Sequence, residues 1–373
     1  MDNSATTPLC AEAAERMKMH IDSHFGNPSS LHSLGAEAQQ RMDAARQSVA
    51  RAIGCDQREV IFTSCGSESD NTAVLGAARA RRRDGRRVIT TAVEHAAVLQ
   101  SFKQLEQEGF EVIYLQPDGS GNISVDALRE AITPDTILIS MMLVNNESGA
   151  RLPVENIRPL CKAASAEALI HCDAVQAFGR MSVRPDKLGV DLISVSAHKI
   201  HGPKGIGALY VGRGKRILPY ILGGGQEGGM RSGTEPTLLI EGFAAACDAL
   251  PAFDKQDEQY RALRSRLLDR LAGLQGITLN SSDGAVPYII NFSVDGIRSE
   301  TLLHFLEARG VFVSSGSACS KGAGSHVLTA MGLPRGRVDS AIRVSLSRMN
   351  TAEDIDALCD GIAAAQQKLR RRR

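Results

Sequence analysis

The feature that most constrains the fold of this chain is an alternation of short apolar runs with helical stretches over its first two thirds. Each run is rich in Val, Ile and Leu and is followed by a stretch with helical patterning, such as residues 96–107. Strands separated by helices are typical of a parallel sheet with both faces covered. The runs are residues 60–63, 88–91, 112–115, 137–144, 169–171, 192–196 and 208–211. The sequence therefore predicts an α/β fold whose large domain contains a mainly parallel seven-stranded sheet.

The last third of the chain has a different pattern. Strand-like runs at residues 288–292, 311–313 and 342–344 alternate with helical stretches at 302–309 and 352–368, and a polar helix begins near Asp254. This pattern predicts a smaller α+β domain. We expect the large domain to span residues 11–250. The small domain would comprise residues 251–373 together with residues 1–10, which pack back onto it.

Composition and charge exclude several classes of function. The 43 basic and 42 acidic residues give a formal net charge of +1, so no overall field attracts nucleic acid directly. No apolar stretch approaches the ~20 residues of a membrane span. The eight cysteines include no Cys-x-x-Cys pair and no secretory leader is present, which together predict a cytoplasmic protein. No His, Cys and Asp residues have the spacing of metal ligands, so no metal is predicted.

A lysine, Lys199, stands just beyond the apolar run 192–195. An amine is nucleophilic only when it is neutral, and a strand end that enters a cleft disfavours the ammonium form. Lys199 is therefore a candidate to form a Schiff base with an aldehyde cofactor. Taken alone, the same pattern also fits a solvated charge at the end of a strand.

An aspartate, Asp173, follows the buried run 168–170. Ligands of parallel α/β sheets bind at the carboxyl ends of the strands. Pyridoxal phosphate needs a carboxylate against its pyridine nitrogen, because a protonated ring is the better electron sink. Asp173 alone fits a helix cap before Ala174 equally well. The presence of Lys199 after the next strand favours the cofactor interpretation.

The run 60–63 breaks into small polar residues and then into a helical stretch that starts near Thr72. Backbone amides at such a helix start, with hydroxyl groups from Ser67, Ser64 or Thr63, form an anion site suited to a phosphate. Neither a Gly-x-Gly-x-x-Gly fingerprint nor a Gly-Lys-Ser loop is present, so the turn predicts no dinucleotide or nucleotide triphosphate site.

Taken together, these segments resemble the NifS/IscS-type cysteine desulfurases of the class V aminotransferase family. The resemblance covers essentially the whole chain, and its motifs occur in the family's order. They are residues 2–8 (Asp-Asn-Ser-Ala-Thr-Thr-Pro), 26–30 (Gly-Asn-Pro-Ser-Ser), 94–98, 144–149, 231–235 and 315–319 (Ser-Gly-Ser-Ala-Cys). The resemblance implies a pyridoxal phosphate (PLP)-dependent transferase of fold type I.

The resemblance also implies a role for each matching residue. Lys199 would hold the cofactor aldehyde, Asp173 would pair with the pyridinium and His95 would stack on the ring. The other cofactor contacts that it implies are Asn146 and Gln176 at the ring hydroxyl, and Gly66, Ser67, Ser196, His198 and Thr234 at the phosphate. Thr234 would reach the site from a second subunit, which implies a homodimer.

The same resemblance implies the substrate and the reaction. Arg343 would bind the carboxylate of L-cysteine with its planar guanidinium fork, with Asn27 nearby. Lys199 would move the Cα proton, and Cys319 would take the sulfur as a persulfide, leaving L-alanine. An iron–sulfur scaffold, tRNA thiolation or nitrogenase maturation would then receive the sulfur, and the sequence does not distinguish among these acceptors.

The surroundings of Cys319, residues 314–324, are small, polar and rich in glycine, which is typical of an exposed mobile loop. An inert buried thiol is the alternative, but no apolar periodicity surrounds this cysteine. The chain departs from the family pattern at several places, among them Cys172 before Asp173. The loop after Cys319 is slightly shorter, Gly228 stands where arginine is common, and Cys65 replaces a glycine of the phosphate turn.

Two other functions stay open at this point. Another class V reaction, such as transamination or selenocysteine lysis, would use Lys199 and Asp173 but would not need Cys319. A sulfur-relay or scaffold-docking protein would bind the cofactor without turnover.

Overall fold

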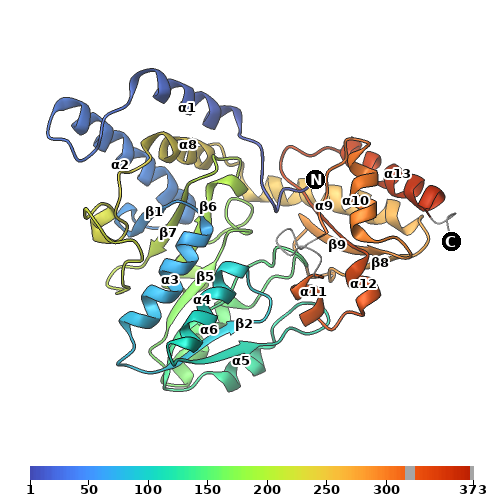
Figure 1. Cartoon of the computed structure of the whole chain (residues 1–373), viewed down its shortest axis with the longest axis horizontal. Coiled ribbons are helices and arrows are strands. Elements are labelled where there is room, and N and C mark those ends of the chain that lie inside the picture. Colours follow the sequence, from blue (N-terminus) through green and yellow to red (C-terminus); the bar gives the residue numbers. More distant parts are fainter. Residues whose placement is uncertain (316–323, 370–373) are drawn as a thin grey trace.

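The computed structural model describes residues 1–315 and 324–369, and these form two lobes (Figure 1). The larger lobe contains a seven-stranded sheet with the order β1-β7-β6-β5-β4-β2-β3. Within the described residues, β7 alone is antiparallel to its neighbours, β1 and β6. The remaining pairs are parallel, which confirms the predicted, mainly parallel sheet. The strands are β1 Val60–Thr63, β2 Arg87–Thr91, β3 Glu111–Leu115, β4 Thr136–Ser140, β5 Leu169–Asp173, β6 Leu192–Ser196 and β7 Gly207–Val211.

Both faces of this sheet are buried, and adjacent residues of a strand enter different cores. Leu138 belongs to the core on one face and its neighbour Ile139 to the core on the other. The same holds for Leu192 and Ile193. Because side chains alternate across a strand, a strand buried on both faces has to be apolar throughout. This explains why these strands appear in the sequence as unbroken apolar runs.

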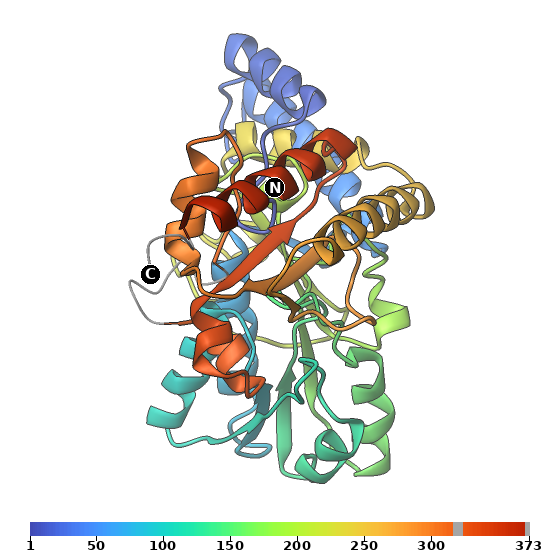
Figure 2. The same cartoon turned by 90° about the vertical axis from the view of Figure 1, so that its right-hand side faces the viewer.

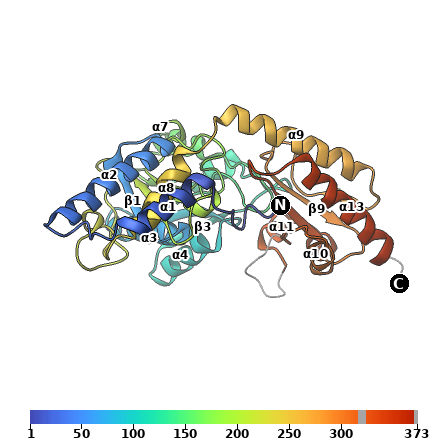
Figure 3. The same cartoon turned by 90° about the horizontal axis from the view of Figure 1, so that it is seen from above.

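Helices supply the apolar partners of the two faces. Helix α3 crosses one face in contact with β1, β4, β5, β6 and β7, and packs against α4. Helices α1, α2 and α8 pack together at one end of the lobe (Figures 1 and 3). The helices of this lobe are α1 Ala11–Ser23, α2 Ser33–Ile53, α3 Gly66–Ala80, α4 Ala96–Gln107, α5 Val125–Ala131, α6 Ile157–Ala163, α7 Pro185–Leu188 and α8 Thr237–Asp248.

The smaller lobe contains an antiparallel sheet with the order β10-β9-β8. Helices α9 and α13 lie side by side across its outer face (Figure 2), where Arg266 and Arg270 both form ion pairs with Asp356. The elements are β8 Ile277–Leu279, β9 Ile289–Val294, β10 Ala341–Ser345, α9 Phe253–Ala272, α10 Ser299–Glu307, α11 His326–Ala330, α12 Arg335–Asp339 and α13 Ala352–Leu369.

The predicted strand at residues 311–313 is wrong. This stretch makes no ladder, and Ser314 after it forms a single bridge with Arg343 of β10. The free edge of β10 is shared, because Asp2 of the N-terminal segment bridges to Ser345 on the same strand. Phe312 is exposed between buried neighbours, which imitates the alternation of a strand. Strand β8, which is only half-buried, was not predicted.

The predicted strand at residues 137–144 is shorter in the structure. Only Thr136–Ser140 forms the ladder, although residues 141–144 stay buried. The N-terminal segment runs along β10, where the amide of Ser345 donates to the Met1 carbonyl at 3.0 Å. The division into domains at residues 10 and 250 stays a prediction.

Candidate active site

A cavity of about 490 Å³ lies where the carboxyl ends of the large sheet meet the small lobe. Most of its lining comes from the loops that follow β1, β2, β4, β5 and β6, and the small lobe contributes Arg343 of β10 and His326 of α11. The lining residues are Ser4, Ala5, Cys65, Gly66, Ser67, Asp70, His95, Ala96, Met142, Asn146, Glu147, Asp173, Val175, Gln176, Ser196, His198, Lys199, His326 and Arg343. This set includes most of the site residues named from the sequence.

Lys199 reaches this cavity from the short helical turn Ala197–Lys199 that follows β6. Its ammonium group donates to the carbonyl oxygens of Ser4 at 2.5 Å and Ala5 at 2.8 Å. Burial lowers the pKa of Lys199 to about 8, and the positive charges of Arg343 and Arg180 act in the same direction. The site therefore raises the neutral, nucleophilic fraction of this amine near neutral pH.

Asp173 is the last residue of β5, and the register of β5 and β6 pairs it with Ser194. Its carboxylate is 5% exposed and accepts a hydrogen bond from the amide of Val175 at 2.9 Å. Burial raises the pKa of Asp173, whereas His95 and Lys199 oppose the increase. A cationic ring nitrogen placed against this carboxylate would stabilise its ionised form further.

The turn after β1, predicted from the sequence to bind an anion, opens onto the cavity. Helix α3 begins at Gly66, where an added Cβ would come within 2.9 Å of Val175. Ser67 in the first turn of α3 and Ser196 at the end of β6 both line the cavity. The hydroxyl of Thr63 instead forms a buried hydrogen bond with that of Ser69 at 2.7 Å, so it is engaged within the protein.

At the small-lobe side of the cavity, Arg343 presents a buried guanidinium group. One terminal nitrogen donates to the carbonyl of Asn146 at 3.0 Å, and the other donates to Asp2 Oδ1 at 2.8 Å. The side chain of Gln176 also lines the cavity and donates to the Ser4 carbonyl at 3.0 Å. A guanidinium that keeps an unused N–H is suited to a carboxylate ligand.

Two of the predicted residues lie outside this cavity. Asn27 and Thr234 are both exposed, and the Asn27 side chain accepts a hydrogen bond from the amide of Ser29 at 2.9 Å. Neither residue is part of the cavity lining in a single chain. Cys319 lies outside the described residues.

Three further cavity residues and one neighbour of the cavity were not assigned a role from the sequence. Burial raises the pKa of Glu147 to about 7 against the opposing effects of Ser325 and Arg343. Asp70 has its pKa raised by burial and by the charge of Asp173. His326 has its pKa lowered by burial. Glu94 is buried beside the cavity, and burial raises its pKa to about 8. In the sequence, Glu94 stands next to His95 and Glu147 stands next to Asn146. This adjacency to predicted site residues was the signal that could have indicated the two glutamates.

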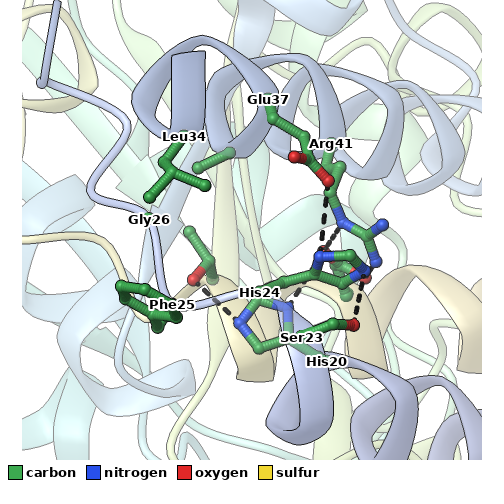
Figure 4. Close-up of a pocket in the computed structure, with 11 residues that line it drawn as sticks. His20, Ser23, His24, Phe25, Gly26, Leu34, Glu37 and Arg41 are labelled. Atoms are coloured by element: carbon green, nitrogen blue, oxygen red, sulfur yellow. Dashed lines mark hydrogen bonds and ion pairs between the residues drawn. The ribbon is translucent and has the colours of Figure 1, made fainter. Parts of the chain in front are cut away.

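A second hollow lies among α1, α2 and α8 (Figure 4). Its volume is about 10 Å³, which is the size of a single water molecule. Its charges pair internally, since Glu241 accepts two hydrogen bonds of 2.7 Å from Arg41 and lies 3.1 Å from His20 Nδ1. We assign this hollow to helix packing. Within residues 1–315 and 324–369, no cluster of three His, Cys, Asp or Glu side chains has the arrangement of a metal site.

The cavity fits pyridoxal phosphate on the chemistry of its donors. Four of its buried polar atoms have no hydrogen-bond partner among the described residues: Ser4 Oγ, Asp70 Oδ1, Ser196 Oγ and Arg343 Nε. Buried polar groups are normally satisfied, so their concentration here indicates a polar ligand. A parallel α/β sheet that presents a desolvated lysine, a carboxylate and an anion-binding turn to one cavity defines the class of PLP-dependent enzymes.

Comparisons with known proteins agree with this class. The family model described as aminotransferase class V matches residues 1–358. The cysteine desulfurase IscS of Vibrio vulnificus strain CMCP6 is 44% identical over 379 positions, covering 99% of this chain and 93% of that protein. A solved NifS-like protein superimposes with a TM-score of 0.92 at 37% identity, covering 98% of both chains. The structure of SspA in complex with cysteine gives a TM-score of 0.82 at 36% identity, covering 92% of this chain and 97% of that one.

The chain therefore belongs to the class V aminotransferase family, among its NifS/IscS-type cysteine desulfurases. Enzymes of this family depend on PLP, and the fold is that of type I PLP-dependent enzymes. No helix in the described part of the chain is both long and apolar enough to cross a bilayer.

Proposed function

We propose that this protein is a PLP-dependent cysteine desulfurase that converts L-cysteine to L-alanine and takes the sulfur onto Cys319. The observation that carries the proposal is that Lys199, Asp173 and Arg343 line one cavity in a chain of this family. A lysine of lowered pKa, a buried carboxylate and a carboxylate-binding arginine are the groups that an amino-acid reaction on PLP needs.

The cofactor would be held by residues from the large lobe. Lys199 would hold the aldehyde, Asp173 the pyridine nitrogen and His95 the face of the ring. Asn146 and Gln176 would contact the ring hydroxyl, and the phosphate would lie at the start of α3. There it would contact Gly66, Ser67, Ser196 and His198. When bound, the cofactor supplies an electron sink that makes the substrate Cα–H acidic.

The chain's own residues would then bind the substrate and move its proton. Arg343 would bind the substrate carboxylate with its unpartnered Nε–H and with the terminal N–H that now bonds Asp2. Lys199, once released from the aldehyde, would take the Cα proton, for which a pKa near 8 suits a base at neutral pH. Burial lowers the pKa of His198 to about 4, and a phosphate bound beside the imidazole would oppose this decrease.

We assign the acceptance of the sulfur to Cys319, which lies outside the described residues. Its thiolate would form a bond to the substrate sulfur as the substrate carbon–sulfur bond breaks. The electron pair of that bond would stay with carbon, which takes up a proton and leaves as alanine. Cys319 would keep the substrate sulfur as a persulfide.

The wider setting is also part of the proposal. Thr234 and Asn27 are exposed on a single chain, so a role in the site requires a second copy of the chain in a homodimer. The seven cysteines among the described residues are free thiols, which suits a cytoplasmic enzyme. An acceptor protein, such as an iron–sulfur scaffold or a component of tRNA thiolation, would receive the sulfur.

Replacing Cys319 by serine tests the persulfide step. We expect Cys319→Ser to retain the absorbance of bound PLP and its change on adding cysteine, but to lose alanine formation. Mass spectrometry of wild-type protein after exposure to cysteine should show one added sulfur on the peptide that contains Cys319. Cys55→Ser is the control, because Cys55 lies outside the cavity and should not matter. Alanine formation by Cys319→Ser at the wild-type rate would refute the proposal.

A further inference from the structure

Helix α11 begins with a serine that contacts the cavity. Ser325 is the N-cap of α11, where its hydroxyl accepts a hydrogen bond from the amide of Leu328 at 3.0 Å. The same hydroxyl donates to Glu147 Oε2 at 2.5 Å. Both side chains are almost fully buried, with Ser325 2% and Glu147 3% exposed. Breaking a hydrogen bond between two groups this deeply buried is costly, because each partner would be left without water to replace the other.

The next residue connects α11 to a second cavity loop. His326 Nε2 lies 3.1 Å from the carbonyl oxygen of Glu94, the residue that precedes His95. The carboxylate of Glu94 is itself fixed, since it accepts hydrogen bonds from the amide of Met142 and the hydroxyl of Thr91. The first turn of α11 is therefore attached to the two loops that carry His95 and Asn146.

The chain on the other side of residues 315–324 is attached to the same loops. Ser314 and Arg343 exchange two backbone hydrogen bonds, of 3.2 Å and 2.6 Å. The guanidinium of Arg343 in turn donates to the carbonyl of Asn146, the neighbour of Glu147. Ser314 and Ser325 are thus both connected to residues 146–147, one through Arg343 and the other through the carboxylate of Glu147.

We propose that Glu147 is a positioning residue. Through its hydrogen bond with Ser325 it holds the chain that follows Cys319 against the 146–147 loop. The same loop contacts Arg343, which would bind the substrate carboxylate. This inference rests on the proposed desulfurase reaction. The carboxylate fixes where α11 begins, and so fixes one end of the short stretch that contains Cys319. Loss of this contact should slow sulfur transfer, while PLP and the carboxylate of cysteine still bind.

Among the hydrogen bonds of residues 1–315 and 324–369, Ser325 is the donor that reaches the side chain of Glu147. A Glu147 side chain that loses its buried donor keeps its desolvation cost. A Ser325 that loses its acceptor leaves α11 capped, but attached to the cavity wall only through the contact of His326 with the Glu94 carbonyl. A purely structural role would reduce stability without separating the two half-reactions. The proposed role predicts a fall in kcat with little change in KM.

The experiment compares holoenzyme variants by steady-state alanine formation and by rapid mixing with cysteine. For Glu147→Ala and Ser325→Ala we expect kcat to fall by about 10- to 100-fold, the effect of leaving one buried hydrogen-bonding group without its partner. KM and the cysteine-induced change in PLP absorbance should stay within about twofold of wild type. Persulfide on Cys319, followed by mass spectrometry in a single turnover, should form more slowly by the same factor.

Three further variants serve as controls. Ser325→Thr keeps the hydroxyl and should restore kcat, and Glu147→Gln keeps an acceptor oxygen and should lose less than Glu147→Ala. Ser124→Ala removes an equivalent N-cap from α5, outside the cavity, and should behave as wild type. These conservative variants decide the question if an alanine variant fails to fold.

Several results would overturn the inference. They are unchanged kcat in Ser325→Ala, an equal loss in Ser124→Ala, or failure of Ser325→Thr to restore kcat. A rise in KM that accounts for the whole loss would also overturn it, because the defect would then lie in substrate binding. Wild-type protein that binds PLP but forms no alanine would refute the proposed function itself, which separates the two failures.

Discussion

Lys199 should capture PLP with a pH dependence that reports its buried environment. Burial lowers its pKa from 10.5 to about 8, which disfavours the ammonium form by about 3 kcal/mol. At pH 7 about one lysine in ten would then be neutral, against about one in 3000 for an ordinary lysine, a difference of about 300-fold. The rate of capture should rise about tenfold for each pH unit below pH 8 and level off above it.

The assay is the reconstitution of apoenzyme with PLP between pH 6.5 and 9.5, followed by absorbance. The reaction of PLP with the model amine Nα-acetyl-lysine, measured alongside, accounts for the ionisation of PLP itself. The rate of this reaction should still be rising at pH 9.5. Lys204→Ala replaces an exposed lysine outside the cavity and should keep the wild-type profile. Lys199→Ala should give no covalent capture. A wild-type rate that continues to rise in parallel with the model amine would refute the reasoning.

Two stability predictions follow from backbone strain and buried charge. Gly149→Ala and Gly332→Ala both place a side chain at φ +75, but only at Gly149 would the new Cβ lie 2.6 Å from a β9 carbonyl oxygen. In denaturant unfolding, Gly149→Ala should lower the free energy of unfolding by about 1–3 kcal/mol more than Gly332→Ala. Equal losses in the two variants would contradict the clash. Glu227→Ala leaves the half-buried guanidinium of Arg46 without its two bonds of 2.6 and 2.7 Å to the buried carboxylate. It should cost about 3–5 kcal/mol, whereas Asp126→Ala, in an exposed pair, should cost about 0–1 kcal/mol.

The sequence predicted the large sheet well because its signal is local. Leu192 and Ile193 enter different cores, so a strand buried on both faces must be continuously apolar, and such a run is visible in the sequence. The run 311–313 has the same local signal, yet the edge of β10 that it would need is shared with the N-terminal segment. That competition involves residues more than 300 positions apart and leaves no trace in a local pattern.

Part of the candidate site was likewise predictable from the sequence, and part was not. Lys199 and Asp173 follow adjacent strands, so the rule that ligands bind at strand ends was enough to place them together. The roles of Glu147 and Asp70 depend on burial and on partners from distant segments, such as Ser325 for Glu147. A lone acidic residue in the sequence indicates neither its burial nor its partners. Asp70 is therefore recognised only once the large lobe is folded, and Glu147 only once the two lobes are in contact.

The N-terminal segment provides the carbonyl groups of Ser4 and Ala5, which accept hydrogen bonds from Lys199. A nitrogen joined to an aldehyde carbon keeps at most one hydrogen, so Ser4 or Ala5 must lose its present donor once the lysine is occupied. The same few residues run along β10, where the amide of Ser345 donates to Met1. The carbonyls whose hydrogen bonding changes when Lys199 is occupied therefore belong to the same short segment that pairs with the edge of the small sheet.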